Sequence, residues 1–439
     1  MDILICKTRF AGPISGADEI AVNYAVELKA AGHRASTLLL QPPAEDDPLA
    51  ARLRAADVPL TTLASAGVGA SFALGRRLVL GAMRAFSPGR RLLRDNSRRL
   101  VHVVLQRYHE SLRAHLTRHR PDVVHVITPD AGAILLVRAA HAAGLPVVYQ
   151  EVGMPFHPPG FEEEYERFAS VMPLCAEIAA LSPRLSRHME RALPQIRRPR
   201  VLPLIAPDTA AEEDTAARSP SDDDAVRFGF AARLEHLKGP LQLVRGFHIA
   251  HRARPSVELR IAGEGSQRRQ IVSTLRGMGL EKKARLTGTY RTLEERSRFM
   301  RDIDVFVLPS LTEGTPNVVI EAMAHAKPVV ATAVGGVSDF VTEDVGILVP
   351  HSDPEALGRA MTRLACDPAL RRAMGAAARR KYRQLFTADA VMPLLTDFYR
   401  RVIDGRDAPG GGREGQAGGP PFHPWTVDTG AAETNGRGR

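Results

Sequence analysis

The sequence predicts an α/β protein with two doubly wound, parallel-sheet domains. Short runs rich in Val, Ile and Leu alternate with longer segments of helical period along most of the chain. Runs that are apolar on both faces are typical of parallel strands covered by helices on either side. An acidic segment without periodicity interrupts the alternation once, and the alternation then starts again. Because 439 residues exceed one ordinary core, this interruption indicates a boundary between two domains.

The expected elements follow the same order in both halves. In the first domain, residues 1–205, strands are expected at residues 2–7, 34–40, 59–63, 123–127, 146–152, 177–181 and 201–205. In the second domain, residues 226–404, they are expected at residues 227–233, 257–262, 284–287, 305–308, 328–332 and 346–349. A helix over residues 17–31 follows the first strand, a second over 317–326 follows the strand at 305–308, and the last helix covers 385–403.

Two segments are expected to lie outside the domains. Residues 206–225 carry seven acidic residues against one arginine, which predicts a solvated linker. The aspartate run at 222–224 belongs to that linker, and we expect no metal site there. Residues 405–439 are rich in Gly and Pro and carry too little apolar surface to order themselves, so we expect a disordered tail.

Charge and cysteine usage bear on the partners and on the compartment. The first domain has a net charge of +7 and the second of +9, which favours anionic ligands but is also typical of arginine-rich surfaces. The three cysteines, Cys6, Cys175 and Cys366, are too far apart to form a disulfide framework and suit a reducing compartment. No apolar stretch reaches the roughly 18 residues of a membrane span, and no leader segment is evident. We therefore expect a cytoplasmic protein.

The basic segment 76–120 leaves two interpretations open. It holds 12 arginines and two acidic residues, with apolar residues at helical spacing. A basic amphipathic helix of this kind makes peripheral contact with anionic membranes. The alternative is a surface helix whose apolar stripe packs on its own domain.

The strongest motif begins at the strand 305–308 and reads LPSLTEGTPNVVIEAMAHAKPVVATAVGG, residues 308–336. Pro316 is expected to be the first residue of the following helix. Ligands of open α/β sheets bind at the carboxyl ends of the strands, where this loop lies. Glu313 precedes the helix and Glu321 lies inside it, and two carboxylates suit the hydroxyls of a polyol. A purely structural role for Glu313, as a partner of the helix dipole, is the alternative.

Two cations follow the first strand of the same domain. The segment GFAARLEHLKGP, residues 229–240, places Arg233 at the strand end and Lys238 just before the next helix. Two cations beside a helix N-terminus suit a diphosphate. Fixed cations there would stabilise the charge that develops on a leaving phosphate, without a metal.

The second half resembles the donor domain of the retaining family-4 glycosyltransferases over residues 226–400. The matching stretches are ARLEHLKG (232–239), LRIAGEG (259–265), the turn at 286–290, residues 304–336 and VGILVP (345–350). The resemblance implies a GT-B fold, in which two Rossmann-like domains face a cleft and the last helix crosses back to the first domain. It implies catalytic roles for Arg233, Lys238 and Glu313, with both cations on the diphosphate and Glu313 on the donor sugar. It implies donor binding by Gly16, Thr287, Gly288, Tyr290, Gly314, Thr315, Pro316, Asn317, Val318 and Glu321, with Glu321 on the ribose hydroxyls.

The first half resembles the family less closely. Gly16 resembles the family's glycine-rich loop, and RPDVVHVITPDAG, residues 120–132, resembles a segment near the reacting sugar. Many members have a second histidine two residues beyond the position of His125, where this sequence has Ile127. His125 itself lies on an apolar strand, which favours a core histidine. His125, Glu151 and His157 are therefore the candidates on the acceptor side.

The predicted function is transfer of a sugar from a nucleoside diphosphate sugar to a hydroxyl acceptor, with retention of the anomeric configuration. The acceptor is expected to be a glycolipid, a polysaccharide or a natural product, and a lipid-linked acceptor at the membrane is one candidate. No cofactor and no essential metal are expected. A nucleotide-sugar-binding protein without transferase activity and a sugar-nucleotide epimerase remain alternatives. Nucleic-acid binding is disfavoured by an aromatic content of 5%, and NAD chemistry by the lack of G-x-G-x-x-G after either first strand.

Overall fold

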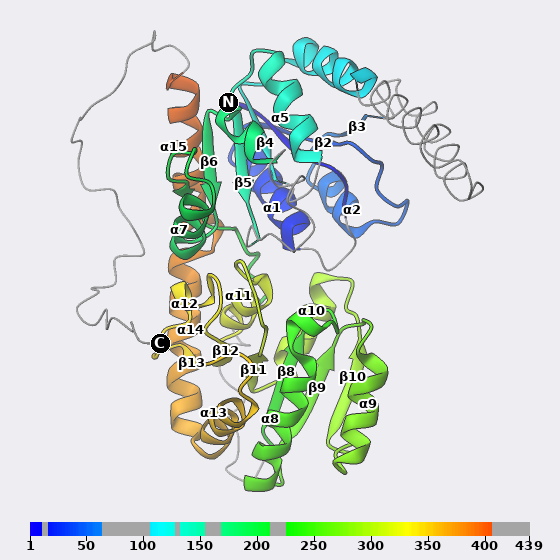
Figure 1. The fold of residues 1–439 in the computed structure, drawn as a ribbon, viewed down its shortest axis with the longest axis vertical. Coiled ribbons are helices and arrows are strands. Elements are labelled where there is room, and N and C mark those ends of the chain that lie inside the picture. The colour runs from blue at the N-terminus through cyan, green and yellow to red at the C-terminus, as the bar shows by residue number, and fades with distance from the viewer. Residues whose placement is uncertain (11–15, 64–105, 128–131, 154–167, 211–224, 406–439) are drawn as a thin grey trace, which may run out of the picture.

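The computed structural model describes residues 1–10, 16–63, 106–127, 132–153, 168–210 and 225–405. Two α/β domains lie one above the other along the long axis of the molecule (Figure 1). The acidic segment 211–224, most of the basic segment 76–120, and the tail from residue 406 lie outside the described residues.

The described part of the first domain forms a seven-stranded parallel sheet in the order β3-β2-β1-β4-β5-β6-β7. The strands are β1 Asp2–Lys7, β2 Arg34–Leu39, β3 Leu60–Thr62, β4 Val123–Val126, β5 Val147–Glu151, β6 Glu177–Ala180 and β7 Arg200–Val201. The helices are α1 Gly16–Ala30, α2 Pro48–Ala55, α5 Gly132–Ala142 and α7 Pro183–Ala192, and residues 106–119 are also helical. Side-chain caps fix two helix starts, Asp47 for α2 and Ser182 for α7.

The second domain forms a six-stranded parallel sheet in the order β10-β9-β8-β11-β12-β13. Its strands are β8 Arg227–Ala231, β9 Glu258–Ala262, β10 Ala284–Gly288, β11 Val305–Leu308, β12 Val329–Thr332 and β13 Gly346–Val349. Its helices are α8 Pro240–Ala253, α9 Arg268–Gly277, α10 Leu293–Arg301, α11 Asn317–Ala324, α12 Val337–Phe340, α13 Pro354–Cys366, α14 Pro368–Leu385 and α15 Ala388–Asp404.

Both sheets have the strand order of a doubly wound nucleotide-binding fold, in which the order reverses between the first and the fourth strand. The central strands are buried on both faces, as in β11, where all four residues are buried. This confirms the predicted fold class. In such folds a crevice forms at the carboxyl ends of the strands where the order reverses, and each of the two domains has one such sheet edge.

Some details of the expected elements were wrong. The strand predicted at 201–205 ends at Val201, because the residues that follow turn away from the sheet and bind α1: Tyr24 donates to the carbonyl of Pro203, and Asn23 to that of Ile205. Pro316 is the N-cap residue and not the first residue of α11, since its ψ of 111° is extended.

Segments distant in sequence connect the two domains. Asp208 forms a two-pronged ion pair with Arg379 of α14, and the carbonyl of Ala206 accepts a hydrogen bond from Tyr382 of the same helix. The last helix, α15, packs against α1 and β4 of the first domain (Figure 1). It begins three residues later than predicted, because Thr387 caps it.

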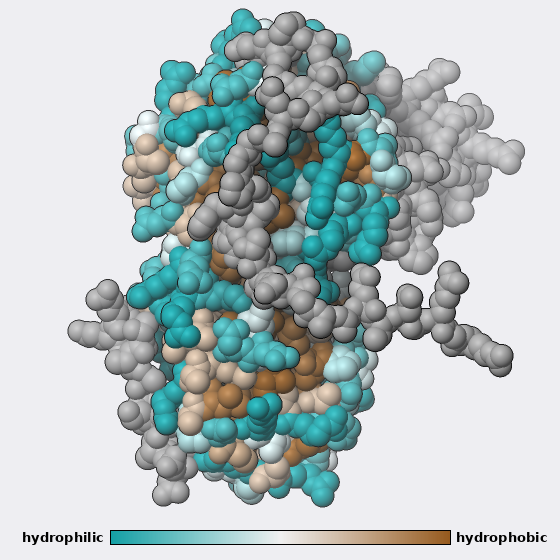
Figure 2. All heavy atoms as spheres, turned by 90° about the vertical axis from the view of Figure 1, so that its left-hand side faces the viewer, coloured by the Kyte–Doolittle hydropathy of each residue, from teal (hydrophilic) through white to brown (hydrophobic). Residues whose placement is uncertain are grey.

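The surface is mixed in hydropathy. On the face shown in Figure 2, hydrophilic side chains cover most of the first domain, and hydrophobic residues lie between hydrophilic ones on the second. Within the parts of the chain that the structure describes, no helix combines the length and the apolar character needed to cross a membrane.

Candidate active site

A cleft of about 560 Å³ lies between the two domains. In the first domain it is lined by residues that follow β1 and β5, and in the second by residues that follow β8 and β11, so the carboxyl edges of both sheets face it. The lining residues are Gly16, Ala17, Glu19, Ile20, Val152, Gly153, Ala231, Ala232, Arg233, Leu237, Lys238, Tyr290, Arg296, Leu308, Thr312, Glu313, Gly314, Thr315, Pro316, Asn317, Val318 and Glu321. Most of the site residues predicted for the donor therefore lie together.

Lys238 and Glu313 form an ion pair in the cleft. The Nζ of Lys238 donates to Oε1 of Glu313 at 2.6 Å, and the hydroxyl of Ser310 donates to the same oxygen at 2.6 Å. The turn carrying Lys238 ends at Gly239, whose φ is +66° and whose added Cβ would lie 2.0 Å from the carbonyl oxygen of Pro309. Only glycine permits this approach, which seats the lysine turn on the loop that carries Glu313.

Arg233 is the second cation of the cleft. It follows β8, it is exposed, and its side chain forms no ion pair or hydrogen bond with any residue that the structure describes. The N-terminus of α8 begins after Gly239, on the same edge of the sheet. An unpaired arginine, a lysine and a helix N-terminus together provide donors for a diphosphate.

The Glu313 loop is held by two glycines of the β12–α12 connection. An added Cβ at Gly335, whose φ is +53°, would lie 1.7 Å from the carbonyl oxygen of Glu313. The N–H of Gly336 donates to the carbonyl of Gly314 at 2.7 Å. On its other side, Gly314 lies against Val152 and Gly153 of the first domain. The loop is thus fixed at the point where the two domains meet.

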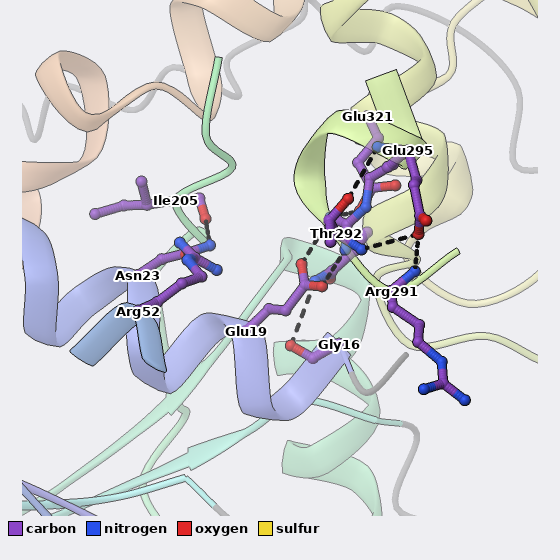
Figure 3. Close-up of polar contacts among 11 residues, drawn as sticks. Gly16, Glu19, Asn23, Arg52, Ile205, Arg291, Thr292, Glu295 and Glu321 are labelled. Carbon is purple, nitrogen blue, oxygen red and sulfur yellow. Dashed lines mark hydrogen bonds and ion pairs between the residues drawn. The ribbon is translucent and has the colours of Figure 1, made fainter. Parts of the chain in front are cut away.

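Glu321 belongs to an ion cluster that spans the cleft (Figure 3). Arg296 of α10 donates from Nη1 to Oε1 of Glu321 at 2.7 Å and to Oε2 of Glu19 at 2.9 Å, while its Nη2 donates to the other oxygen of Glu19. Burial raises the pKa of Glu321, and the charge of Glu19 raises it further, against the opposite effect of Arg296. We name Glu19, Arg296 and Glu321 the interdomain triad.

Sequence reasoning missed Glu19 and Arg296. Arg296 lies two residues from Arg298 on an arginine-rich helix, and no local pattern distinguishes the two arginines. Arg296 is nevertheless buried, whereas the side chain of Arg298 is 68% exposed. Both carboxylates around Arg296 keep its pKa above the usual value despite burial.

The residues predicted at the base end of the donor separate into two groups. Tyr290 is partly buried, lines the cleft, and lies under the guanidinium of Arg296 at 5.5 Å from the ring centroid. Thr287 and Gly288 do not line the cleft. The hydroxyl of Thr287 donates to the carbonyl of Ile261, and Gly288, with a φ of +75°, accepts from the backbone of a neighbouring loop. Thr287 and Gly288 therefore support the turn that leads to Tyr290 and do not form the cleft wall.

His125 lies in the core of the first domain and not in the cleft. Its Nδ1 and the hydroxyl of Tyr399 on α15 are hydrogen-bonded at 2.7 Å, and its ring stacks on Tyr24. Burial lowers the pKa of His125 to about 3, so the ring is neutral near pH 7. Ile127, where relatives often have a second histidine, is also fully buried.

Glu151 lies directly behind the cleft wall. Tyr149 donates to its Oε2 at 2.8 Å, and the N–H groups of Val152 and Gly153 donate to its Oε1 at 3.0 and 2.9 Å. Burial raises its pKa, and these three hydrogen bonds partly offset the effect. Glu151 therefore fixes the turn that faces Gly314. His157, the third acceptor-side candidate, lies outside the described residues.

No group of three or more His, Cys, Asp or Glu side chains among the described residues is arranged to hold a metal ion.

Known proteins resemble part of the chain in sequence. Residues 225–367 match the family described as glycosyl transferases group 1. The D-inositol 3-phosphate glycosyltransferase of Kineococcus radiotolerans is 33% identical over 221 residues, 46% of this chain and 50% of the relative. That of Streptomyces griseus is 32% identical over 250 residues, 55% of this chain and 52% of the relative. The chain thus spans about half the length of the curated relatives it matches.

Solved structures resemble it over nearly its whole length. HepE from Anabaena in complex with UDP aligns with a TM-score of 0.65 at 18% identity, covering 91% of this chain and 100% of that one. Sucrose-phosphate synthase from Thermosynechococcus elongatus aligns with a TM-score of 0.69 at 18% identity, covering 92% and 100%. The architecture is therefore the GT-B fold. Within this fold, the match to the glycosyl transferases group 1 family falls on the second domain.

Proposed function

We propose that this protein transfers a sugar from a nucleoside diphosphate sugar to a hydroxyl group, with retention of the anomeric configuration. The observation that carries the proposal is the set of Arg233, Lys238, Glu313 and Glu321 around one cleft between two Rossmann-like domains. HepE, a protein of the same fold, has UDP-glucose in one of its structures, which supports a nucleotide-sugar donor.

The proposed donor pose follows the chemistry of the cleft from end to end. Tyr290 lies at the nucleoside end, Glu321 accepts from the ribose hydroxyls, and Arg233 and Lys238 bind the diphosphate. Glu313, already paired with Lys238, accepts from hydroxyls of the donor sugar. This order places both cations on the oxygens that gain charge when the bond from sugar to phosphate breaks.

The proposed reaction uses no carboxylate nucleophile. Both oxygens of an ion-paired Glu313 serve better as hydroxyl acceptors, and the leaving phosphate itself takes the proton of the incoming hydroxyl. Closure of the domains over the donor excludes water and limits hydrolysis. Because the two cations neutralise the diphosphate, we expect the reaction to need no metal, and its rate to be unchanged in excess EDTA.

The first test is a thermal-shift screen against UDP-, GDP- and ADP-sugars, followed by acceptor-dependent release of the nucleoside diphosphate. A donor at about 100 times its dissociation constant stabilises the protein by about 2.7 kcal/mol. We expect one nucleotide class to stabilise the wild type and to fail with Glu321→Ala. The anomeric coupling in the NMR spectrum of the product tests retention.

The alternatives predict different outcomes in the same experiment. Donor binding with neither transfer nor slow hydrolysis would indicate a nucleotide-sugar-binding protein. Isomerised donor in the absence of acceptor would indicate an epimerase. Full activity in both Glu321→Ala and Lys238→Ala would refute the assignment of the site.

The acceptor is proposed to be a hydroxyl of a glycolipid, a polysaccharide or a natural product. The relatives are named for D-inositol 3-phosphate, which adds polyol phosphates to the acceptors worth testing. A cytoplasmic location and peripheral contact of residues 76–120 with an anionic membrane stay predictions. Cosedimentation with anionic but not with neutral vesicles, lost when arginines of that segment become serine, is the expected result.

A further inference from the structure

The interdomain triad brings a residue of the first domain to the proposed ribose site. Arg296 and Glu321 belong to the second domain, whereas Glu19 lies in the first turn of α1 in the first. A second contact lies beside it, since Asn317 at the start of α11 donates to the carbonyl of Gly16 at 3.3 Å. The starts of α1 and α11 therefore meet at the nucleoside end of the cleft (Figure 3).

The triad is buried and its charges do not balance. The side chains of Arg296, Glu19 and Glu321 are 7%, 7% and 12% exposed, and one guanidinium serves two carboxylates. Arg52 of α2 lies close enough to influence Glu19, but its guanidinium donates to Asn23 instead. Two buried carboxylates around one guanidinium weaken folding unless further polar groups compensate for them.

Two polar atoms of the triad are buried without a hydrogen-bond partner among the described residues. They are Oε2 of Glu321, an acceptor, and Nε of Arg296, a donor, and both residues line the cleft. A hydroxyl group donates to a carboxylate and accepts from a guanidinium N–H, so hydroxyls satisfy both atoms. The ribose of a nucleotide offers two adjacent hydroxyls.

We propose that Arg296 is a positioning residue of the donor site, which holds Glu321 toward the ribose hydroxyls and is itself held in place by Glu19 from the opposite domain. The proposal rests on the proposed function. Arg296 keeps one oxygen of Glu321 occupied, so the other is the one that the ribose meets. Glu19 binds both terminal nitrogens of Arg296 and fixes the plane of its guanidinium. Recognition of the ribose therefore depends on contact between the two domains, although Glu321 itself lies on the second domain.

The test measures how the contribution of the ribose hydroxyls changes when the triad is altered. Dissociation constants of UDP, GDP and ADP, and of their 2′,3′-dideoxy counterparts, are measured by calorimetry on the wild type, Arg296→Ala and Glu19→Gln. Loss of the hydroxyls leaves Glu321 unsatisfied, so we expect the wild type to bind the dideoxy form about 10- to 100-fold more weakly.

We call the dissociation constant of the dideoxy form divided by that of the normal nucleotide the hydroxyl ratio. In Arg296→Ala the hydroxyl ratio should fall to within about threefold of one, because Glu321 is no longer oriented, while binding of the dideoxy form should change little. Glu19→Gln should give an intermediate ratio. Arg298→Ala is the matched control, since Arg298 lies on the same helix and its guanidinium pairs with the exposed Glu294, and it should keep the ratio of the wild type. Arg296→Lys retains the positive charge but lacks the planar, two-pronged guanidinium. The same dissociation constants are measured on it if the alanine variant does not fold.

The outcomes separate this proposal from the proposed function. An unchanged hydroxyl ratio in Arg296→Ala and Glu19→Gln overturns the role of the triad, even if the wild type transfers sugar. If the hydroxyl ratio falls in the triad variants and the wild type transfers no sugar, the result supports the role of the triad and counts against the proposed transferase activity. A wild type that binds none of the three nucleotides overturns both.

Discussion

Replacing Lys238 should affect sugar transfer more than it affects the stability of the loop that carries Glu313. Glu313 is 6% exposed in its side chain and has two donors to one oxygen, Lys238 and Ser310. Lys238→Met keeps most of the apolar volume of the lysine stem and removes only the charge. The buried carboxylate then keeps the hydroxyl of Ser310 alone.

The expected magnitudes follow from the geometry. Breaking a fully buried ion pair costs about 3–5 kcal/mol of unfolding free energy. Lys238 is 23% exposed and Ser310 remains, so about 1–3 kcal/mol is expected here. Transfer should suffer more, because the lysine also faces the leaving phosphate. Loss of one fixed group at the site of developing charge lowers kcat by about 100- to 1,000-fold.

The assay combines urea unfolding with kcat for the donor identified in the screen. The double variant Lys238→Met/Glu313→Gln removes the unpaired charge, so it should regain stability while transfer stays low. Lys29→Met is the control, since Lys29 forms an exposed pair with Asp57, away from the cleft, and should affect neither quantity. A kcat for Lys238→Met within about threefold of the wild type would refute the catalytic role.

Three further results are expected. The pKa of His125 is depressed to about 3, so the unfolded chain binds its proton more readily; stability is present above the ordinary value near 6.5 and is lost as the pH falls toward 3. Between about pH 7 and pH 4, urea unfolding of the wild type should lose about 3 kcal/mol more than that of His125→Asn, and equal losses would contradict the burial argument. Gly335→Ala should destabilise the protein by several times the ~1 kcal/mol expected for Gly32→Ala. Both glycines have a positive φ, but only an added Cβ at Gly335 would also clash with the backbone of Glu313. Similar melting temperatures for the two variants would contradict the proposed support of the Glu313 loop by Gly335. Excess EDTA should leave the transfer rate unchanged, and a loss that Mg²⁺ restores would show that the two cations do not suffice.

The strand pattern was predictable because it depends on local composition. Of the predicted strands, β1, β11 and β13 have the observed bounds, and most others differ by a residue or two at an end. The run at 201–205 misled, since four of its five residues are apolar and a buried run looks the same whether it packs in a sheet or against a helix. Here hydrogen bonds from Tyr24 and Asn23 take it off the sheet.

The positions of the cleft residues in the second domain were predictable because these residues lie in short segments next to strand ends. Arg233, Lys238, Glu313 and Glu321 are each placed by one strand and one loop, and parallel strands bring their carboxyl ends to one edge. Position along the chain therefore translates directly into position at the cleft.

Two decisions depended on the tertiary structure alone. His125 has its hydrogen-bond partner Tyr399 far along the chain, so only the return of α15 shows that it is a core residue. In sequence, Arg296 cannot be told from the other arginines of α10. Its ion pair with Glu19, which lies in the other domain, is seen only in the tertiary structure.

The sequence by itself determined the two sheets, their order along the chain, and the charges at the edge of the second, because hydrophobic period and strand-end position are local properties. Only the tertiary structure decided which of many arginines is buried, that His125 lies in the core, and how the first domain reaches the cleft. Those outcomes depend on contacts between residues far apart in sequence, and such contacts have no signature in the local pattern of either partner.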